Sequence, residues 1–81
     1  MNSDTTKFSF SNDKSSDVRE IVSYVYDAMK ERGYNPINQI VGYILTEDPT
    51  YITNYKNARG MIRRIDRDEL MASMIKEYLG L

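Results

Sequence analysis

The sequence predicts an all-α fold, and three observations lead to that prediction. Apolar residues recur at the three- and four-residue spacing of a helix face in several separate stretches. No run shows the alternation of β-branched residues that is typical of a sheet. Glycine and proline stand where helices end and begin. We therefore expect a compact bundle of about four short helices over residues 17–81, preceded by a disordered tail over residues 1–16.

The first predicted helix covers residues 17–32. Ser16 or Asp17 can cap it, and Glu20 lies three residues after Asp17, in the position of a capping box. Gly33 follows as a left-handed stop, and the short link after it implies that the next helix is a neighbour in space. One apolar face repeats at helical spacing and consists of Val18, Ile21, Val22, Val25, Ala28 and Met29.

The second predicted helix, residues 36–46, is the stretch around which we expect the rest to be organised. Pro36 suits the first helical position, because its missing N–H would have no partner there, and Asn35 can cap with its side-chain oxygen. Gly42 inside this helix costs roughly 1 kcal/mol relative to alanine, so we expect the close approach of another backbone. The apolar stripe consists of Ile37, Ile40, Val41, Ile44 and Leu45.

Asp48 and Pro49 end the second helix and can begin an extra helical turn. Thr53 is then the candidate cap of a third helix over residues 54–65. Asp66 starts a fourth helix with Glu69 in the capping-box position, although one bent helix across Asp66 is an alternative. The fourth helix has the most regular stripe of the chain, namely Leu70, Met71, Met74, Ile75, Tyr78 and Leu79.

Every predicted helix has an apolar face of more than two residues. A domain of about 65 residues has little interior in which to share those faces. The surplus of apolar surface leads us to expect a homodimer with two-fold symmetry.

Composition excludes several classes of function. The 81 residues include 11 Lys and Arg and 12 Asp and Glu, a formal charge of −1, so the basic excess of a nucleic-acid binder is missing. Histidine and cysteine are both absent, which removes imidazole bases, thiolate nucleophiles and the usual zinc ligands. We therefore expect no enzymatic activity, no metal and no cofactor. The sequence shows no signal peptide and no membrane-spanning run, which favours a cytoplasmic location.

Four basic residues follow one another at i, i+3, i+7 and i+11: Lys56, Arg59, Arg63 and Arg67. On a single helix they would share one face, which is either a solvated surface stripe or an anion-docking face. The helix over residues 59–67 also invites comparison with a helix-turn-helix protein. A DNA-binding regulator is therefore an alternative, against which the overall acidity argues.

Five segments together resemble the IreB family of small regulatory phosphoproteins of Gram-positive bacteria. The first and most specific is Gly-Tyr-Asn-Pro-Ile-Asn-Gln-Ile-Val-Gly-Tyr-Ile-Leu at residues 33–45. The others are Asp-Pro-Thr-Tyr-Ile at 48–52, Asn-Ala-Arg at 57–59, Ile-Arg at 62–63 and Arg-Asp-Glu at 67–69. The tail is also similar to the family's Thr-x-x-Phe-x-Phe pattern, because Phe8 and Phe10 follow Thr5 at that spacing.

The resemblance implies a cytoplasmic, all-helical homodimer that does not itself catalyse a reaction. A transmembrane Ser/Thr kinase with extracellular PASTA repeats would phosphorylate it, and a partner phosphatase would reverse that. The implied role is in signal transduction that controls cell-envelope stress responses and intrinsic cephalosporin resistance, through a downstream protein that the sequence does not identify.

The resemblance also points to Thr5 as the phosphoacceptor, with the neighbouring Thr6 as the other candidate. We further expect that a phosphate on Thr5 docks on the face formed by Lys56, Arg59 and Arg63.

Overall fold

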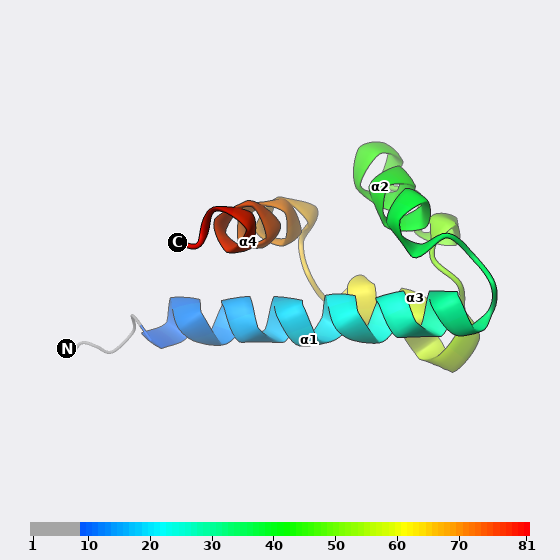
Figure 1. Ribbon diagram of the computed structural model, residues 1–81, viewed down its shortest axis with the longest axis horizontal. Helices are drawn as coiled ribbons and strands as arrows, with labels where there is room; N and C mark the ends of the chain where they lie inside the picture. Colours follow the sequence, from blue (N-terminus) through cyan, green and yellow to red (C-terminus); the bar gives the residue numbers. More distant parts are fainter. Residues whose placement is uncertain (1–8) are drawn as a thin grey trace.

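Four α-helices and two 3₁₀ turns make up the described part of the chain, residues 9–81 of the computed structural model, and no strand occurs in it. The long helix α1 (Ser9–Glu31) supports the others (Figure 1). Helix α4 (Arg67–Leu79) lies along the N-terminal half of α1, whereas α2 (Pro36–Thr46) and α3 (Ala58–Ile62) gather around its C-terminal half. The predicted all-α class is confirmed.

Helix α1 begins at Ser9, two turns earlier than the prediction of residue 17. The expected caps Ser16 and Asp17 therefore lie inside the helix, and the predicted boundary between tail and body does not coincide with a helix end. Once residues 17–31 form a helix, each added residue costs only propagation, because nucleation has already occurred. Thr5 and Thr6 lie outside the described residues.

The core forms where the apolar face of α1 meets the later elements. Ile52, Ala58, Ile62 and Leu70 are fully buried, as is Val25 of α1. The predicted stripe of α1 is inward-facing as expected. The buried set consists of Val18, Ile21, Val25, Ala28, Met29, Ile40, Tyr43, Ile52, Ala58, Ile62, Ile65 and Leu70.

Helix α2 has the predicted start and end. The Asn35 side chain accepts a hydrogen bond from the Asn38 backbone N–H at 3.1 Å, and Pro36 is the first helical residue. Glu47 ends the helix in the left-handed region, with φ of 63°, and its N–H donates to the Tyr43 carbonyl at 2.9 Å.

The close approach at Gly42 is real, but a side chain makes it and not another backbone. A Cβ on Gly42 would lie 2.4 Å from Cε1 of Tyr51. The ring reaches this position because Tyr51 ends the predicted extra turn, η1 (Pro49–Tyr51), which Asp48 caps by accepting from the Thr50 N–H at 3.0 Å. A missing Cβ therefore makes room for the ring on the surface of α2.

The predicted third helix over residues 54–65 is wrong in its first half. The chain forms a 3₁₀ turn, η2 (Tyr55–Asn57), in which Lys56 and Asn57 have φ of 52° and 61°, and α3 starts only at Ala58. Thr53 is not the cap, because Asn54 precedes η2 and Asn57 precedes α3, but the Thr53 side chain accepts a hydrogen bond from the Tyr55 N–H at 3.2 Å.

Helices α3 and α4 are separate, so the alternative of one bent helix across Asp66 is also wrong. Asp66 precedes α4 as predicted, although its side chain makes no capping hydrogen bond.

Candidate interaction surfaces

The four basic residues predicted to share one helix face lie on different elements. Lys56 belongs to η2, Arg59 lies in α3, Arg63 follows α3, and Arg67 is the first residue of α4. The left-handed residues before α3 and the break after it rotate these side chains away from a single stripe. The prediction of one continuous basic helix face was therefore wrong.

Three of the four basic side chains hold the protein's own elements together. Lys56 pairs with Glu31 at 3.2 Å, and the half-buried Arg59 donates through Nε to the Ile52 carbonyl at 2.9 Å. Arg67 donates to the Ile44 carbonyl at 2.6 Å and pairs with Glu47 at 2.5 Å, so it binds the C-terminal end of α2 to α4. Docking of an anion at these residues stays a prediction.

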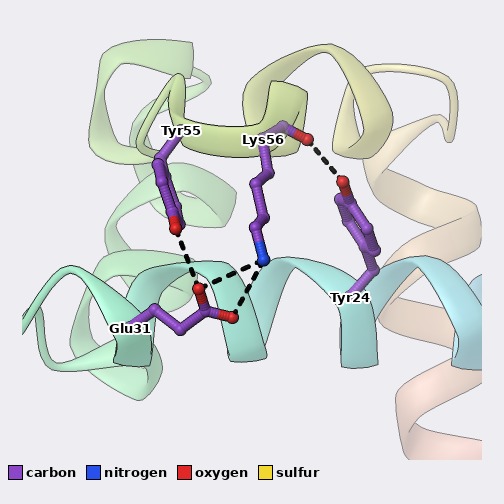
Figure 2. Close-up of polar contacts among 4 residues, drawn as sticks. All are labelled: Tyr24, Glu31, Tyr55 and Lys56. Atoms are coloured by element: carbon purple, nitrogen blue, oxygen red, sulfur yellow. Dashed lines mark hydrogen bonds and ion pairs between the residues drawn. The ribbon is translucent and has the colours of Figure 1, made fainter.

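A polar cluster between α1 and η2 explains the unusual backbone of η2. Figure 2 shows Tyr24 and Glu31 of α1 facing Tyr55 and Lys56. The Tyr24 hydroxyl donates to the Lys56 carbonyl at 2.6 Å, and the Tyr55 hydroxyl donates to Glu31 at 2.9 Å. The hydrogen bonds from Tyr55 and Lys56 lower the pKa of Glu31 below its usual value of 4.5. The same carboxylate raises the pKa of Lys56.

This cluster predicts a loss of stability in acid. Because the folded-state pKa of Glu31 lies below its unfolded value, its contribution is present above that value and is lost as pH falls through the lowered pKa. Lys56 has the opposite sign, so its contribution is lost only as alkaline pH rises through its raised pKa.

We expect the Glu31→Gln variant to lose less stability than the wild type when the pH falls from neutral to below the usual glutamate pKa. The midpoint of urea unfolding, determined at each pH for both proteins, measures this loss of stability. Glu20→Gln, which changes an exposed carboxylate in the middle of α1, is the matched control. Identical pH profiles for Glu31→Gln and the wild type would contradict the assigned role of Glu31.

An apolar groove lies between α2 and α4 and encloses about 410 Å³. Leu45 on α2 is 77% exposed, and Ile75 and Tyr78 on α4 are 54% and 90% exposed. Of the 13 residues of α4, Leu70 alone is buried. The lining carries no formal charge and consists of Val41, Ile44, Leu45, Met71, Met74, Ile75, Tyr78 and Leu79.

Part of the surplus apolar surface expected from the sequence lies in this groove, and other exposed apolar residues, such as Ile37 and Leu81, lie outside it. The sequence did not indicate which helices would expose it, because the stripe of α4 looks like an ordinary core-facing stripe. The sequence of α2 does indicate exposed apolar surface, because its apolar residues occupy more of the helix circumference than a single buried face needs.

Neither a metal site nor a membrane span is found in residues 9–81. No group of three or more His, Cys, Asp or Glu in that part of the chain is placed to hold a metal ion. No helix among the same residues is long and apolar enough to cross a bilayer.

The fold and its surfaces define a small all-α protein with an uncharged groove between two helices. Comparison with known proteins specifies the family. The model of the family described as IreB regulatory phosphoprotein matches residues 3–80, and the chain belongs to this family.

Curated relatives agree with that assignment. A UPF0297 protein from Ruminiclostridium cellulolyticum is 57% identical over 76 residues, which are 94% of this chain and 86% of the relative. A UPF0297 protein from Acetivibrio thermocellus is 53% identical over 78 residues, covering 96% of this chain and 87% of the relative. The family is one of regulatory proteins, and the alternative of a DNA-binding regulator receives no support from these relatives.

Proposed function

We propose that this protein is a cytoplasmic, non-enzymatic regulatory phosphoprotein whose signal is a phosphate on Thr5 or Thr6. The observation that carries the proposal is the family match, which extends from residue 3 to residue 80 and so includes both threonines. The modifying enzymes are a transmembrane Ser/Thr kinase with PASTA repeats and its partner phosphatase. The protein acts as a homodimer in the cell-envelope stress response, and it modulates intrinsic cephalosporin resistance through a downstream protein.

The phosphate changes the charge of the N-terminal segment to which a partner protein binds. It adds about −1.5 to −2 charge units close to Phe8 and Phe10. Docking on the protein's own basic residues is the less favoured route, because Lys56, Arg59 and Arg67 already have partners within the fold. The proposed effect is therefore to change the affinity of the downstream protein for the first ten residues.

Phosphorylation in vitro tests this proposal. We expect the purified kinase domain of a PASTA-repeat kinase with ATP to add phosphate to the wild type, and phosphopeptide mass spectrometry to locate it at Thr5 or Thr6. The Thr5→Ala, Thr6→Ala double variant should lose the phosphate. Thr50→Ala, which removes an exposed hydroxyl within the body, is the control and should keep it. Undiminished phosphorylation of the double variant would exclude both proposed acceptors.

A further inference from the structure

We propose that the polar cluster between α1 and η2 (Figure 2) is a latch that keeps η2 apart from α3, and that its release joins the two into one helix with a basic face. The proposal does not depend on phosphorylation of the N-terminal segment. It starts from two consecutive non-glycine residues in the left-handed region, Lys56 and Asn57, with φ of 52° and 61°. Such residues favour the right-handed helix, so contacts from elsewhere must hold them where they are.

The joined helix would cover residues 54–62, and the local sequence suits it. The four residues that would join α3 include no glycine and no proline. Helix α3 has only five residues, and extending it adds hydrogen bonds without a new nucleation step. Three of the four joining residues are exposed, and Tyr55 is half-buried. The rearrangement therefore moves a segment that contributes little to the core.

Contacts from α1 oppose the joined helix. The Tyr24 hydroxyl donates to the Lys56 carbonyl at 2.6 Å, whereas in a continuous helix that carbonyl would accept from the N–H of Gly60. Glu31 accepts from the Tyr55 hydroxyl at 2.9 Å and pairs with Lys56 at 3.2 Å. These contacts lie at the surface, where each contributes modestly to stability. The loss of one contact therefore shifts the equilibrium between the two forms without unfolding the protein.

Release of the latch changes which cations the surface offers. In the observed form Lys56 is paired with Glu31, and Nε of Arg59 donates to the Ile52 carbonyl at 2.9 Å. In the joined helix Lys56, Arg59 and Arg63 stand at i, i+3 and i+7, so they share one face. The ligand class that fits three cations on one face is an oxyanion. An oxyanion that binds only the joined form draws the equilibrium toward it.

Substitutions of opposite sign test the latch. Tyr24→Phe removes one hydrogen bond and should raise the population of the joined helix about two- to tenfold. Asn57→Gly should lower that population, because glycine adopts positive φ freely and disfavours a helix. Tyr26→Phe is the matched control, since it removes a hydroxyl of α1 outside the cluster. Relaxation-dispersion NMR measures the population, and the minor state should have helical Cα shifts at Lys56 and Asn57.

Binding of inorganic phosphate is the second measurement. Titration with phosphate, against chloride at the same ionic strength, should shift the amide signals of Arg59 and Arg63. The apparent affinity should rise in Tyr24→Phe by the same factor as the population of the joined helix, because only that form binds. The substitution changes no formal charge, so a general electrostatic effect does not produce this rise.

Two results would count against the proposal, each at a different step. The double variant Tyr24→Phe, Glu31→Gln removes the α1 side of the latch, and the absence of helical shifts at residues 55–57 in it would overturn the latch. A joined helix whose population changes while the phosphate affinity stays constant would overturn the basic face. Neither result bears on whether Thr5 or Thr6 is phosphorylated.

Discussion

Replacing Leu70 with alanine is expected to lower the free energy of unfolding by about 2–5 kcal/mol, the range for deleting a fully buried leucine. Leu70 is 0% exposed and is the residue of α4 that enters the core. Its loss leaves a cavity and removes the main apolar anchor between α4 and the rest of the protein. Chemical denaturation followed by circular dichroism measures the change.

Leu81→Ala is the matched control, because it deletes the same side chain at a position that is 88% exposed. Its free energy of unfolding should stay within about 0.5 kcal/mol of the wild type. Hydrogen exchange should show that Leu70→Ala loses protection first in α4, while α1 retains protection around Val25. A Leu70→Ala variant as stable as the Leu81→Ala variant would mean that α4 is held by other contacts.

The effect of Gly42→Ala on the free energy of unfolding is expected to depend on the Tyr51 ring: the substitution destabilises the protein when the ring is present and stabilises it when the ring is absent. In the wild-type background the new Cβ would clash with the ring, and such overpacking typically costs about 1–3 kcal/mol. Alanine also gains roughly 1 kcal/mol of helix propensity over glycine, so the net effect is a modest destabilisation. In a Tyr51→Ala background the clash disappears, and Gly42→Ala should stabilise by roughly 1 kcal/mol.

Four proteins complete this experiment: the wild type, the two single variants and the double variant. Their free energies of unfolding give the coupling between positions 42 and 51, expected at about 1–3 kcal/mol. The hydrogen bond from the Gln39 side chain to the Tyr51 carbonyl, 2.8 Å long, uses the backbone and is available in all four. If Gly42→Ala has the same effect in both backgrounds, the ring is not the reason for the glycine.

The parts of the fold that the sequence predicts well are those with local signals. Asn35 and Pro36 fix the start of α2 through a cap and a restricted φ, and Asp48 does the same for η1. Such signals act within three residues, so they need no knowledge of the rest of the molecule. The apolar stripe of α1 is predicted equally well from the sequence, because the helix is long enough for its helical period to be unambiguous.

The errors occur where distant contacts decide the backbone. At η2, the Tyr24 hydroxyl and Glu31 hold Lys56 in the left-handed region, although the sequence there fits a continuous helix. The prediction of one basic helix face was wrong for the same reason, because residues at that spacing share a face only on an uninterrupted helix. At the N-terminus, the polar composition led to a predicted helix start at residue 17, whereas α1 begins at Ser9.

The periodicity of apolar residues also does not show whether the stripe of α4 is buried in the core or exposed in the groove. Six apolar residues of α4 form one regular stripe, yet only Leu70 is buried while Met71, Ile75, Tyr78 and Leu79 are exposed. A helical stripe shows that a helix has an apolar face, and the same pattern serves a core and an interface. Which of the two applies follows from how the helices pack, and that is settled by contacts far apart in sequence.

Helix α4 contributes one buried residue, Leu70, to the core, so few contacts within the chain hold it. If a second copy binds only the formed groove, mass action stabilises α4 as concentration rises, and dilution lets the end of the chain fray. Amide exchange in α4 would then slow with each increase in protein concentration, while exchange in α1 stayed constant.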